Sequence, residues 1–355
     1  MAMLAICIPT FNRAAQLKAN LTHLADLLSR HDVEVHVSDN CSTDDTGAVV
    51  ASFRERSPRI FYHRNATNVG MDGNFAVALG LANTPYVWLL GDDDVVSEVT
   101  LGGVLELLAD ETYDLILLNG GHPDPDRGRV QGEPSRDFHD PERLLVELGW
   151  HATWISSLVI GRRLLGAMDV PTYDGTYFSH FIALFGGMAA IGQPRVRWHA
   201  PSSFHPSHLA SFSWTRRVIE IFATRWSQAV RAIPGPYSAE ARQACIRAHG
   251  VRTGLLTMVG LLNLRAKGGL DLAEVRRHRE ALAQCSPCPW PLIVAIAAIP
   301  QSWLGTVRRF ALRLRRPPSP EAPPAPAEAV ETARFPFRQT ALDRLTGDHA
   351  RSAER

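Results

Sequence analysis

The first 120 residues alternate between two patterns of apolar positions. Short apolar segments bounded by proline, glycine or polar residues are typical of strands buried inside a sheet. They predict strands at residues 4–10, 33–37, 60–63, 86–90 and 114–118. The intervening helical patterns predict helices at about 14–28, 46–56, 70–82 and 101–108. Strands that alternate with helices predict an α/β fold with crossover connections and a largely parallel sheet.

The predicted strand at 86–90 ends in a glycine followed by three consecutive aspartates, at residues 91–94. In open α/β sheets, ligands bind at this carboxyl edge. Three adjacent carboxylates repel one another, so a cation would stabilise them, and hard oxygen ligands suit Mg²⁺ or Mn²⁺. Such an ion typically completes its shell with substrate phosphates. The alternative is a solvated acidic turn before a helix that begins near Ser97, where acidic residues favour the helix N-terminus.

Polar loops follow the other predicted strands and converge on this acidic turn. Residues 9–13 and 39–45 follow the first two strands, and the glycine- and amide-rich residues 68–74 open a helix. Residues 120–140 are rich in proline and glycine, which predicts an excursion over the site rather than part of the core.

The rest of the chain divides into three regions. Further predicted elements are a strand at 154–161, an apolar helix within 173–188, a strand at 195–199 and helices from about 212 to 283, interrupted at 233–236. We predict an α/β domain at 1–215, a helical region at 216–316 and a proline- and alanine-rich, disordered tail at 317–355.

Composition narrows the class of protein. The chain has 355 residues, 45% of them hydrophobic and 21% charged, enough to bury a sizeable core. Its formal net charge of +1 gives no argument for a nucleic-acid partner. The N-terminus lacks a basic region and a cleavage site, so we expect no signal peptide and a cytoplasmic protein. Cys285 and Cys288 have CxxC spacing without a second pair, which favours unpaired thiols over zinc.

The apolar segment at 290–303 is too short for an ordinary membrane span. An arginine cluster follows it, at Arg308, Arg309, Arg313, Arg315 and Arg316. This pairing suits a peripheral anchor at the inner face of the plasma membrane. A core helix with a solvated basic end is the alternative.

Four segments, in matching order and spacing, resemble family 2 glycosyltransferases of the GT-A fold. They are residues 6–13, 37–44, 68–70 and 91–94. The Leu-Leu-Gly-Asp-Asp-Asp sequence at 89–94 and the Tyr-Phe-Ser-His sequence at 177–180 are most similar to abequosyltransferase-like, O-antigen-type enzymes. The resemblance covers residues 3–215 and implies a GT-A domain with a mostly parallel central sheet flanked by helices.

The resemblance also implies roles for individual residues. Those at the positions that pack the nucleotide base and ribose are Pro9, Thr10, Asn12 and Arg13. Asp39 falls at the aspartate that hydrogen-bonds the base. Asn68, Gly70 and Asn74 fall in the loop that approaches the nucleotide-sugar.

The acidic turn falls at the family's Asp-x-Asp motif, which binds a divalent metal and the diphosphate. Gly91 stands at the usual first aspartate, so Asp93 becomes the best metal-ligand candidate, with Asp92 or Asp94 assisting. Many GT-A enzymes supply a late histidine to the metal or diphosphate. Of His199, His205 and His208 we take His205 as the candidate, although an ordinary loop histidine is the favoured reading for any one of them.

The chain departs from the family pattern at Gly91 and, a second time, at the position of the general base. Inverting members carry Glu-Asp at the start of a helix, where this chain has Ser179 and His180. A histidine can deprotonate a hydroxyl near neutral pH. We therefore predict His180 as the base and Asp174 as the runner-up. The alternative for His180 is a half-buried histidine without a catalytic role.

Together these features predict metal-dependent transfer of a sugar from a nucleotide-diphospho-sugar to a glycan or lipid-linked glycan hydroxyl in surface polysaccharide biosynthesis. The resemblance suggests inversion at the anomeric carbon. The alternative is a catalytically impaired nucleotide-sugar or glycan-binding module. A Rossmann-type oxidoreductase is disfavoured because the first strand lacks a following Gly-x-Gly-x-x-Gly, and no P-loop supports a phosphoryl transferase.

Overall fold

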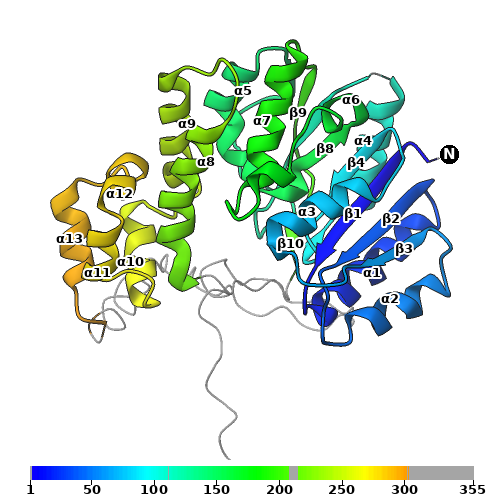
Figure 1. The fold of residues 1–355 in the computed structure, drawn as a ribbon, viewed down its shortest axis with the longest axis horizontal. Helices are drawn as coiled ribbons and strands as arrows, with labels where there is room; N and C mark the ends of the chain where they lie inside the picture. Colours follow the sequence, from blue (N-terminus) through cyan, green and yellow to red (C-terminus); the bar gives the residue numbers. More distant parts are fainter. Residues whose placement is uncertain (1, 111, 208–214, 302, 304–355) are drawn as a thin grey trace, which may run out of the picture. The chain divides into compact units, whose positions relative to one another are not determined.

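An eight-stranded sheet forms the centre of the fold, in the order β3-β2-β1-β4-β8-β6-β9-β7 (Figure 1). The computed structural model describes residues 2–110, 112–207, 215–301 and 303. The strands are β1 (Leu4–Thr10), β2 (Val33–Asp39), β3 (Ile60–Arg64), β4 (Tyr86–Leu89), β6 (Leu115–Asn119), β7 (Arg136–Phe138), β8 (Leu158–Gly161) and β9 (Val196–Ser202). The strands predicted in the first 120 residues are confirmed.

The sheet is mostly parallel, as expected for the GT-A fold. Strands β3, β2, β1 and β4 pair in parallel, and β6 pairs in parallel with β9. Strand β8 is antiparallel to both of its neighbours, β4 and β6. It therefore begins at the edge of the sheet where β4 ends, and the residues before it reach the acidic turn.

Both faces of the sheet are covered by helices. Along β1, Leu4, Ile6 and Ile8 belong to one apolar cluster, whereas Ala5 and Cys7 belong to the other. The first cluster includes residues of α1 (Ala14–Leu28), α2 (Thr46–Arg54) and α4 (Glu98–Asp110). The second includes residues of α3 (Gly70–Gly80), α5 (Pro141–Leu148) and α7 (Ser179–Ile191). A strand buried on both faces explains the uninterrupted apolar segments of the sequence.

Two segments differ from their predicted structure. The strand predicted at 154–161 covers only Leu158–Gly161, because Gly149–Thr153 and Ile155–Ser157 form the 3₁₀ turns η1 and η2. Within the predicted loop at 120–140, Arg136–Phe138 forms the edge strand β7, where Phe138 is buried.

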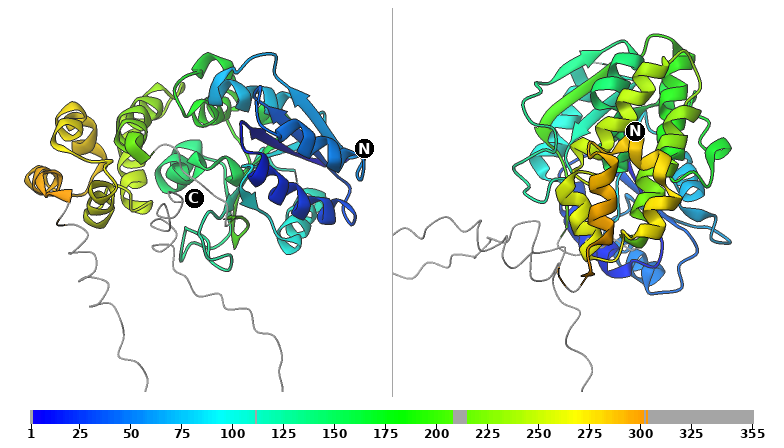
Figure 2. Two further views of the ribbon diagram at one scale, coloured as in Figure 1. Left: turned by 90° about the horizontal axis from the view of Figure 1, so that it is seen from below. Right: turned by 90° about the vertical axis from the view of Figure 1, so that its left-hand side faces the viewer.

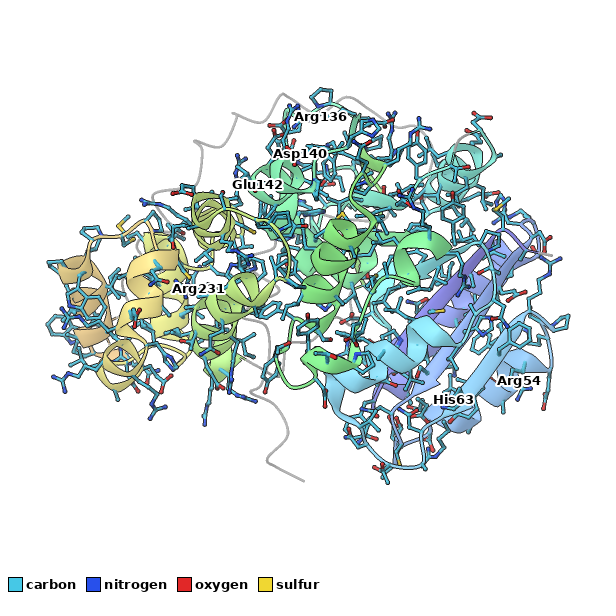
Figure 3. The ribbon with its side chains drawn as sticks, turned by 45° about the horizontal axis from the view of Figure 1, so that its top comes forward. Arg54, His63, Arg136, Asp140, Glu142 and Arg231 are labelled. Carbon is cyan, nitrogen blue, oxygen red and sulfur yellow. The ribbon has the colours of Figure 1, made fainter. Side chains whose placement is uncertain are left out.

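The helical pattern predicted after residue 212 is confirmed where the structure describes it. The helices are α8 (Trp226–Ala232), α9 (Ala239–Arg252), α10 (Met258–Ala266), α11 (Leu272–Arg277), α12 (Arg279–Cys285) and α13 (Trp290–Ala298). Helices α8 and α9 contact α7 and α5 (Figure 2). Glu142 on α5 and Arg231 on α8 are labelled in Figure 3. Glu142 accepts hydrogen bonds from the amide and hydroxyl of Ser238, and Arg231 donates to Gln284 on α12.

Residues Met1–Gln301 form one compact unit. The predicted boundaries at 215 and 316 stay predictions. In α13, Ile293, Ile296 and Ala297 are buried, so part of the apolar segment at 290–303 belongs to the core. The arginine cluster and the tail lie outside the described residues.

Within the part of the chain that the structure describes, no single helix has the length and apolar character of a membrane span. Helices α12 and α13, which are bent by 117° relative to each other, meet that test only as a pair. All five cysteines are free thiols.

Candidate functional site

The acidic turn at 91–94 is fixed by hydrogen bonds from two other elements. Asn20, buried on α1, donates to the carbonyl oxygens of Gly91 (3.0 Å) and Asp94 (2.8 Å). The Ser156 hydroxyl, in η2, accepts from the Gly91 amide at 2.8 Å. A Cβ at position 91 would lie 2.9 Å from an Asp94 carboxylate oxygen, so a larger residue there would require that carboxylate to shift. The backbone of the turn is therefore held firmly from two sides.

The three carboxylates have three different environments. Asp92 is buried, and its oxygens accept hydrogen bonds from Thr10 Oγ1 (2.8 Å) and Arg13 Nε (2.9 Å). Burial raises the pKa of Asp92 to about 6 despite the nearby Arg13 guanidinium. Asp93 pairs with the other end of the same guanidinium and keeps 22% of its side chain exposed. Asp94 accepts from Ser156 Oγ, and burial, with the neighbouring Asp93 charge, raises its pKa to about 7.

His205 lies beside the acidic turn. Strand β10 (His205–Pro206) pairs antiparallel with β5 (Asp94–Val95), and the Ser207 amide donates to the Asp93 carbonyl oxygen at 2.7 Å. The chain therefore brings together the backbone segments that carry the predicted metal-ligand candidates Asp93, Asp94 and His205. His199 lies on β9 opposite Leu118, and burial lowers its pKa. His208 falls outside the described residues.

The loops after β1 and β2 are bonded to each other. The Asn12 amide donates to Ser42 Oγ at 2.8 Å, and the Asn12 side-chain oxygen accepts from the Thr43 amide at 2.7 Å. Asn12 has a φ of 52°, a conformation that asparagine adopts more readily than most residues. Pro9 is buried within β1, next to Thr10. The predicted residues of the first loop thus lie between the acidic turn and the second loop.

Asp39, at the end of β2, is fully buried and accepts three hydrogen bonds. Tyr62 OH (2.6 Å) and Arg64 (3.1 Å) donate to one oxygen, and the Ser42 amide (2.8 Å) donates to the other. Burial and the bond to Asp39 raise the pKa of Tyr62 to about 12. Sequence reasoning missed Tyr62 and Arg64. The parallel register of β2 and β3, which pairs Asp39 with Arg64, is the signal that could have found them.

The loop at 68–74 is joined to the second loop by side-chain amides. Asn40 donates to Asn68 at 2.8 Å and to the Gly70 carbonyl oxygen at 3.0 Å. Gly70 has a φ of 80°, which glycine adopts without strain. Asn74 is buried and bonds to both the hydroxyl and the carbonyl oxygen of Ser38. Asn68 and Gly70 therefore face the solvent side of the loop, whereas Asn74 holds it to β2.

The two candidate bases differ in accessibility. His180 is 2% exposed, and its Nε2 lies 3.3 Å from the Thr153 carbonyl oxygen. Burial lowers its pKa to about 4. Asp174 is exposed, and one of its carboxylate oxygens lies 4.0 Å from the position that a Cβ would take at Gly70. His180 is thus more buried than the half-buried histidine that the sequence suggested, and its catalytic role stays a prediction.

Two further residues near the site carry no local sequence signal. Asp72, buried on α3, accepts from the Tyr177 amide and from both the amide and hydroxyl of Ser179, which fixes the start of α7. Arg129, from the predicted loop at 120–140, lies 4.4 Å from the Trp154 ring and donates to the Gly121 carbonyl oxygen. Burial lowers the pKa of Arg129 to about 10, although Asp94 opposes this shift.

The donor set fits a divalent cation that takes few ligands from the protein. Among the described residues, no group of three or more histidine, cysteine, aspartate or glutamate side chains is arranged to hold a metal ion. Asp92 is occupied by Thr10 and Arg13, and Asp94 by Ser156, which leaves Asp93 as the partly exposed carboxylate. Mg²⁺ typically binds through one or two carboxylates, with water and substrate phosphates completing its shell.

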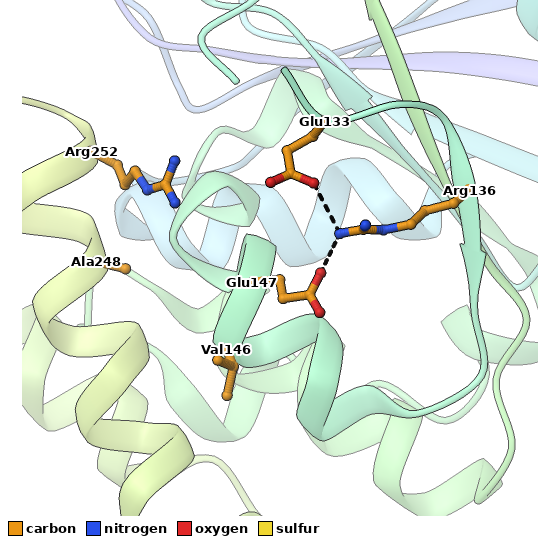
Figure 4. A pocket seen from close by; sticks show the side chains of 6 residues that line it. All are labelled: Glu133, Arg136, Val146, Glu147, Ala248 and Arg252. Atoms are coloured by element: carbon orange, nitrogen blue, oxygen red, sulfur yellow. Dashed lines mark hydrogen bonds and ion pairs between the residues drawn. The ribbon is translucent and has the colours of Figure 1, made fainter. Parts of the chain in front are cut away.

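A separate charged cavity of about 440 Å³ lies at β7, α5 and α9 (Figure 4). Its lining residues are Glu133, Arg136, Val146, Glu147, Ala248 and Arg252. Arg136 pairs with Glu133 (3.2 Å) and Glu147. None of the predicted site residues lines this cavity.

Comparison with known proteins gives matches in sequence and in fold. Residues 5–156 match the family model described as Glycosyl transferase family 2. Abequosyltransferase RfbV of Salmonella typhimurium is 27% identical over 215 residues, which cover 56% of this chain and 63% of that protein. GalNAc(5)-diNAcBac-PP-undecaprenol beta-1,3-glucosyltransferase of Campylobacter jejuni is 32% identical over 114 residues, or 32% of this chain. The chain spans 63% and 36% of the lengths of these two relatives.

The similar solved structures include S. aureus TarS. TarS 1-349 in complex with UDP-GlcNAc superimposes with a TM-score of 0.53 at 16% identity, covering 88% of this chain and 89% of that one. The crystal structure of TarS 1-349 gives a TM-score of 0.51 at 14% identity, covering 87% and 92%. These likenesses support the GT-A fold. Residues 5–156, which contain the acidic turn and the loops around it, match glycosyltransferase family 2, and the similarity in sequence is concentrated in this part of the chain.

Proposed function

We propose that this protein is a glycosyltransferase that moves a sugar from a nucleotide-diphospho-sugar to an acceptor hydroxyl. The observation that carries the proposal is the rigid acidic turn in a family 2 domain, with a partly exposed Asp93 at the carboxyl edge of the sheet. The names of both curated relatives describe glycosyltransferases, and TarS was crystallised with UDP-GlcNAc. These facts support the same donor class for this chain.

The loops around the turn are suited to hold the nucleotide. We propose that Thr10, Asn12 and Arg13 contact the ribose and diphosphate, and that Asp39 hydrogen-bonds the base. The Asp39 carboxylate is oriented by Tyr62 and Arg64 but is fully buried, so these donors or the surrounding loop must shift before a base can bond to it. Asn68 and Gly70 lie on the loop that would approach the sugar.

We propose Asp93 as the protein ligand of Mn²⁺ or Mg²⁺, with His205 beside it. Asp94 holds the turn through its hydrogen bond with Ser156. When bound, the ion would neutralise the charge that develops on the leaving diphosphate. Asp92 orients Arg13, whose guanidinium suits phosphate oxygens.

The proposed transfer needs a general base at the acceptor hydroxyl. Exposure supports Asp174, because a base must reach the proton that it removes. His180 could act only if the packing of its ring against Phe75 opened, since their centroids are 5.4 Å apart in this interior position. Replacing each residue separately and measuring turnover will distinguish them. We further propose a single displacement, which inverts the anomeric centre.

We propose a glycan or lipid-linked glycan acceptor at the inner face of the plasma membrane. One relative is named as acting on an undecaprenol-linked glycan, and the arginine cluster after residue 303 suits anionic lipid headgroups. Co-sedimentation of the full chain with vesicles containing phosphatidylglycerol tests this. Binding that salt abolishes supports it, whereas full recovery in the supernatant contradicts the membrane contact without affecting the transfer reaction.

A second candidate function is a nucleotide-sugar-binding module with impaired turnover. The burial of His180, the base that the sequence predicts, favours this alternative. Turnover by the wild-type chain would exclude it.

Thermal unfolding against a panel of nucleotide-sugars, each with and without Mn²⁺, tests the proposed function first. A ligand that binds only the native state raises the melting temperature. We expect a metal-dependent rise with one donor, followed by sugar transfer or hydrolysis of that donor. The Asp93→Asn variant is the matched control and should lose the metal-dependent part of the rise. No rise with any donor at saturation would contradict the proposal.

A further inference from the structure

The side chain of Arg13 spans two consecutive carboxylates of the acidic turn. Its Nε lies 2.9 Å from Asp92 Oδ1, and a terminal nitrogen of the same guanidinium pairs with Asp93 Oδ2. Thr10 donates to the remaining oxygen of Asp92. Three of the four carboxylate oxygens of Asp92 and Asp93 therefore accept hydrogen bonds from the protein.

We propose that Arg13 is an internal counter-cation that must leave Asp93 before a divalent metal can bind there. In the chain without ligands, the guanidinium neutralises the carboxylate charge that a bound metal would otherwise neutralise. A nucleotide diphosphate draws the guanidinium onto its phosphates, and the metal then enters with the nucleotide. This inference rests on the proposed function, because it assigns an order of binding to the same site.

The positive charges of Arg13 and of a divalent metal ion support this exchange. An arginine side chain remains protonated in proteins, so a divalent ion at Asp93 would lie beside a permanent positive charge. The two cations repel each other and compete for one carboxylate. Phosphate groups offer the guanidinium a planar, bidentate partner and so relieve both effects.

The geometry allows Arg13 to move while the turn stays in place. Arg13 precedes α1 and keeps 26% of its side chain exposed. The backbone of the turn is held from other directions, by Asn20 at the Gly91 and Asp94 carbonyl oxygens and by Ser156 at the Gly91 amide. Departure of the guanidinium therefore leaves the carboxylates preorganised for a metal.

The proposed exchange couples the binding of metal to the binding of nucleotide. If the nucleotide raises the affinity for metal, the metal must raise the affinity for the nucleotide by the same factor. Such couplings typically reach about 5–150-fold. Without Arg13, metal and nucleotide should bind more nearly independently.

Titration with Mn²⁺, followed by electron paramagnetic resonance of the free ion, tests the inference without measuring turnover. The proteins are wild type, Arg13→Gln and the matched control Arg136→Gln, which removes an arginine paired with Glu133 and Glu147 outside the proposed site. Each is titrated with Mn²⁺ alone and with saturating UDP, CDP, GDP or dTDP.

We expect Arg13→Gln to bind Mn²⁺ alone at least about fivefold more tightly than wild type, the lower end of typical couplings. Arg136→Gln should match wild type with Mn²⁺ alone and with each nucleotide. A nucleotide should tighten Mn²⁺ binding in wild type and have a smaller effect in Arg13→Gln. Thermal unfolding of each variant verifies folding. Should Arg13→Gln not fold, Arg13→Lys, which can reach only one carboxylate, should give an intermediate increase.

Equal affinity of wild type and the Arg13 variants for Mn²⁺ alone would overturn the inference. If a nucleotide still promoted Mn²⁺ binding in that case, the proposed function would stand. If Mn²⁺ bound to none of the proteins under any condition, both the inference and the proposed metal site would fail.

Discussion

Arg13 and Arg136 are each held by two acidic side chains, in very different surroundings. Arg13 pairs with Asp92 and Asp93 at the end of β4. Arg136 pairs with Glu133 and Glu147 at the cavity between β7, α5 and α9 (Figure 4). The ionic groups are of the same kind in both clusters, which we call the strand-end cluster and the cavity cluster.

The clusters differ in burial and in how their backbone is fixed. Asp92 is 6% exposed and its turn is locked by Asn20 and Ser156. In the cavity cluster each charged side chain is about a third exposed, and the three come from a loop, an edge strand and a helix. Water screens such surface pairs, which contribute about 0–1 kcal/mol. Burial of a carboxylate and a fixed backbone therefore distinguish the strand-end cluster, where we propose the functional site, from the cavity cluster.

The largest expected difference between the clusters is in activity. Asp93→Asn should lower sugar transfer about 10²–10³-fold, the usual cost of removing one preorganised electrostatic contact in an active site. The measurement is the initial rate with saturating donor and Mn²⁺. Glu147→Gln, in the cavity cluster, is the control and should leave the rate unchanged. Similar losses in both variants would contradict the distinction that we draw.

The second prediction concerns the pH dependence of stability near the strand-end cluster. His151 is fully buried close to Arg129, and burial lowers its pKa to about 4. The folded state thus keeps His151 neutral while the unfolded chain takes up a proton below about pH 6.5. Its contribution is fully present above pH 6.5 and is lost as pH falls toward 4, on the order of 3 kcal/mol in total.

Urea denaturation between pH 4 and 7.5 measures this contribution. His151→Gln keeps a donor for the Leu118 carbonyl oxygen and should flatten the dependence. His139, exposed beside the cavity cluster, supplies the control, and His139→Gln should leave the profile as it is. Identical profiles for wild type and His151→Gln would show that His151 does not titrate in this way.

The third prediction concerns the rigidity of the turn. Asn20→Ala removes two hydrogen bonds and leaves the carbonyl oxygens of Gly91 and Asp94 without that donor. We expect a loss of about 1–3 kcal/mol in the free energy of unfolding, typical of buried polar groups that lose a partner. Thr22→Ala, at an exposed position of α1, should change stability by less than about 0.5 kcal/mol. A neutral Asn20→Ala would mean that the turn does not depend on α1.

The smallest effect is expected at the cavity cluster itself. Arg136→Gln breaks both surface ion pairs but should cost at most about 1 kcal/mol. Its effect should also shrink in 0.5 M salt because the charges are screened. A loss of several kcal/mol that salt does not change would show that the cavity cluster is as structurally important as the strand-end cluster.

Local patterns in the sequence predicted most of the sheet and the outline of the site. The apolar strands followed by polar loops gave Asp39, the acidic turn and the loop at 68–74, because parallel strands bring their carboxyl ends to one edge. Helix α1 begins and ends at the predicted residues, Ala14 and Leu28.

The parts that sequence could not predict depend on contacts between distant segments. Ser156 lies in a 3₁₀ turn where the apolar pattern predicted a strand, and it reaches Asp94 across 62 positions of sequence. Asp72 bonds Ser179 across 107 positions. His180 is buried because α7 is apolar on all sides and its first turn is tied to α3, which no local pattern reveals.

The antiparallel direction of β8 also affects the order in which the protein can assemble during synthesis. Strands β3, β2, β1 and β4 come from the first 89 residues and connect through short crossovers, so they can pair as soon as they leave the ribosome. Ser156 and β8 are made more than 60 residues later. We expect the nascent chain to carry the aspartates in an unfixed turn until β8 adds to the edge of β4, so donor binding is gained late, after half of the sheet has formed.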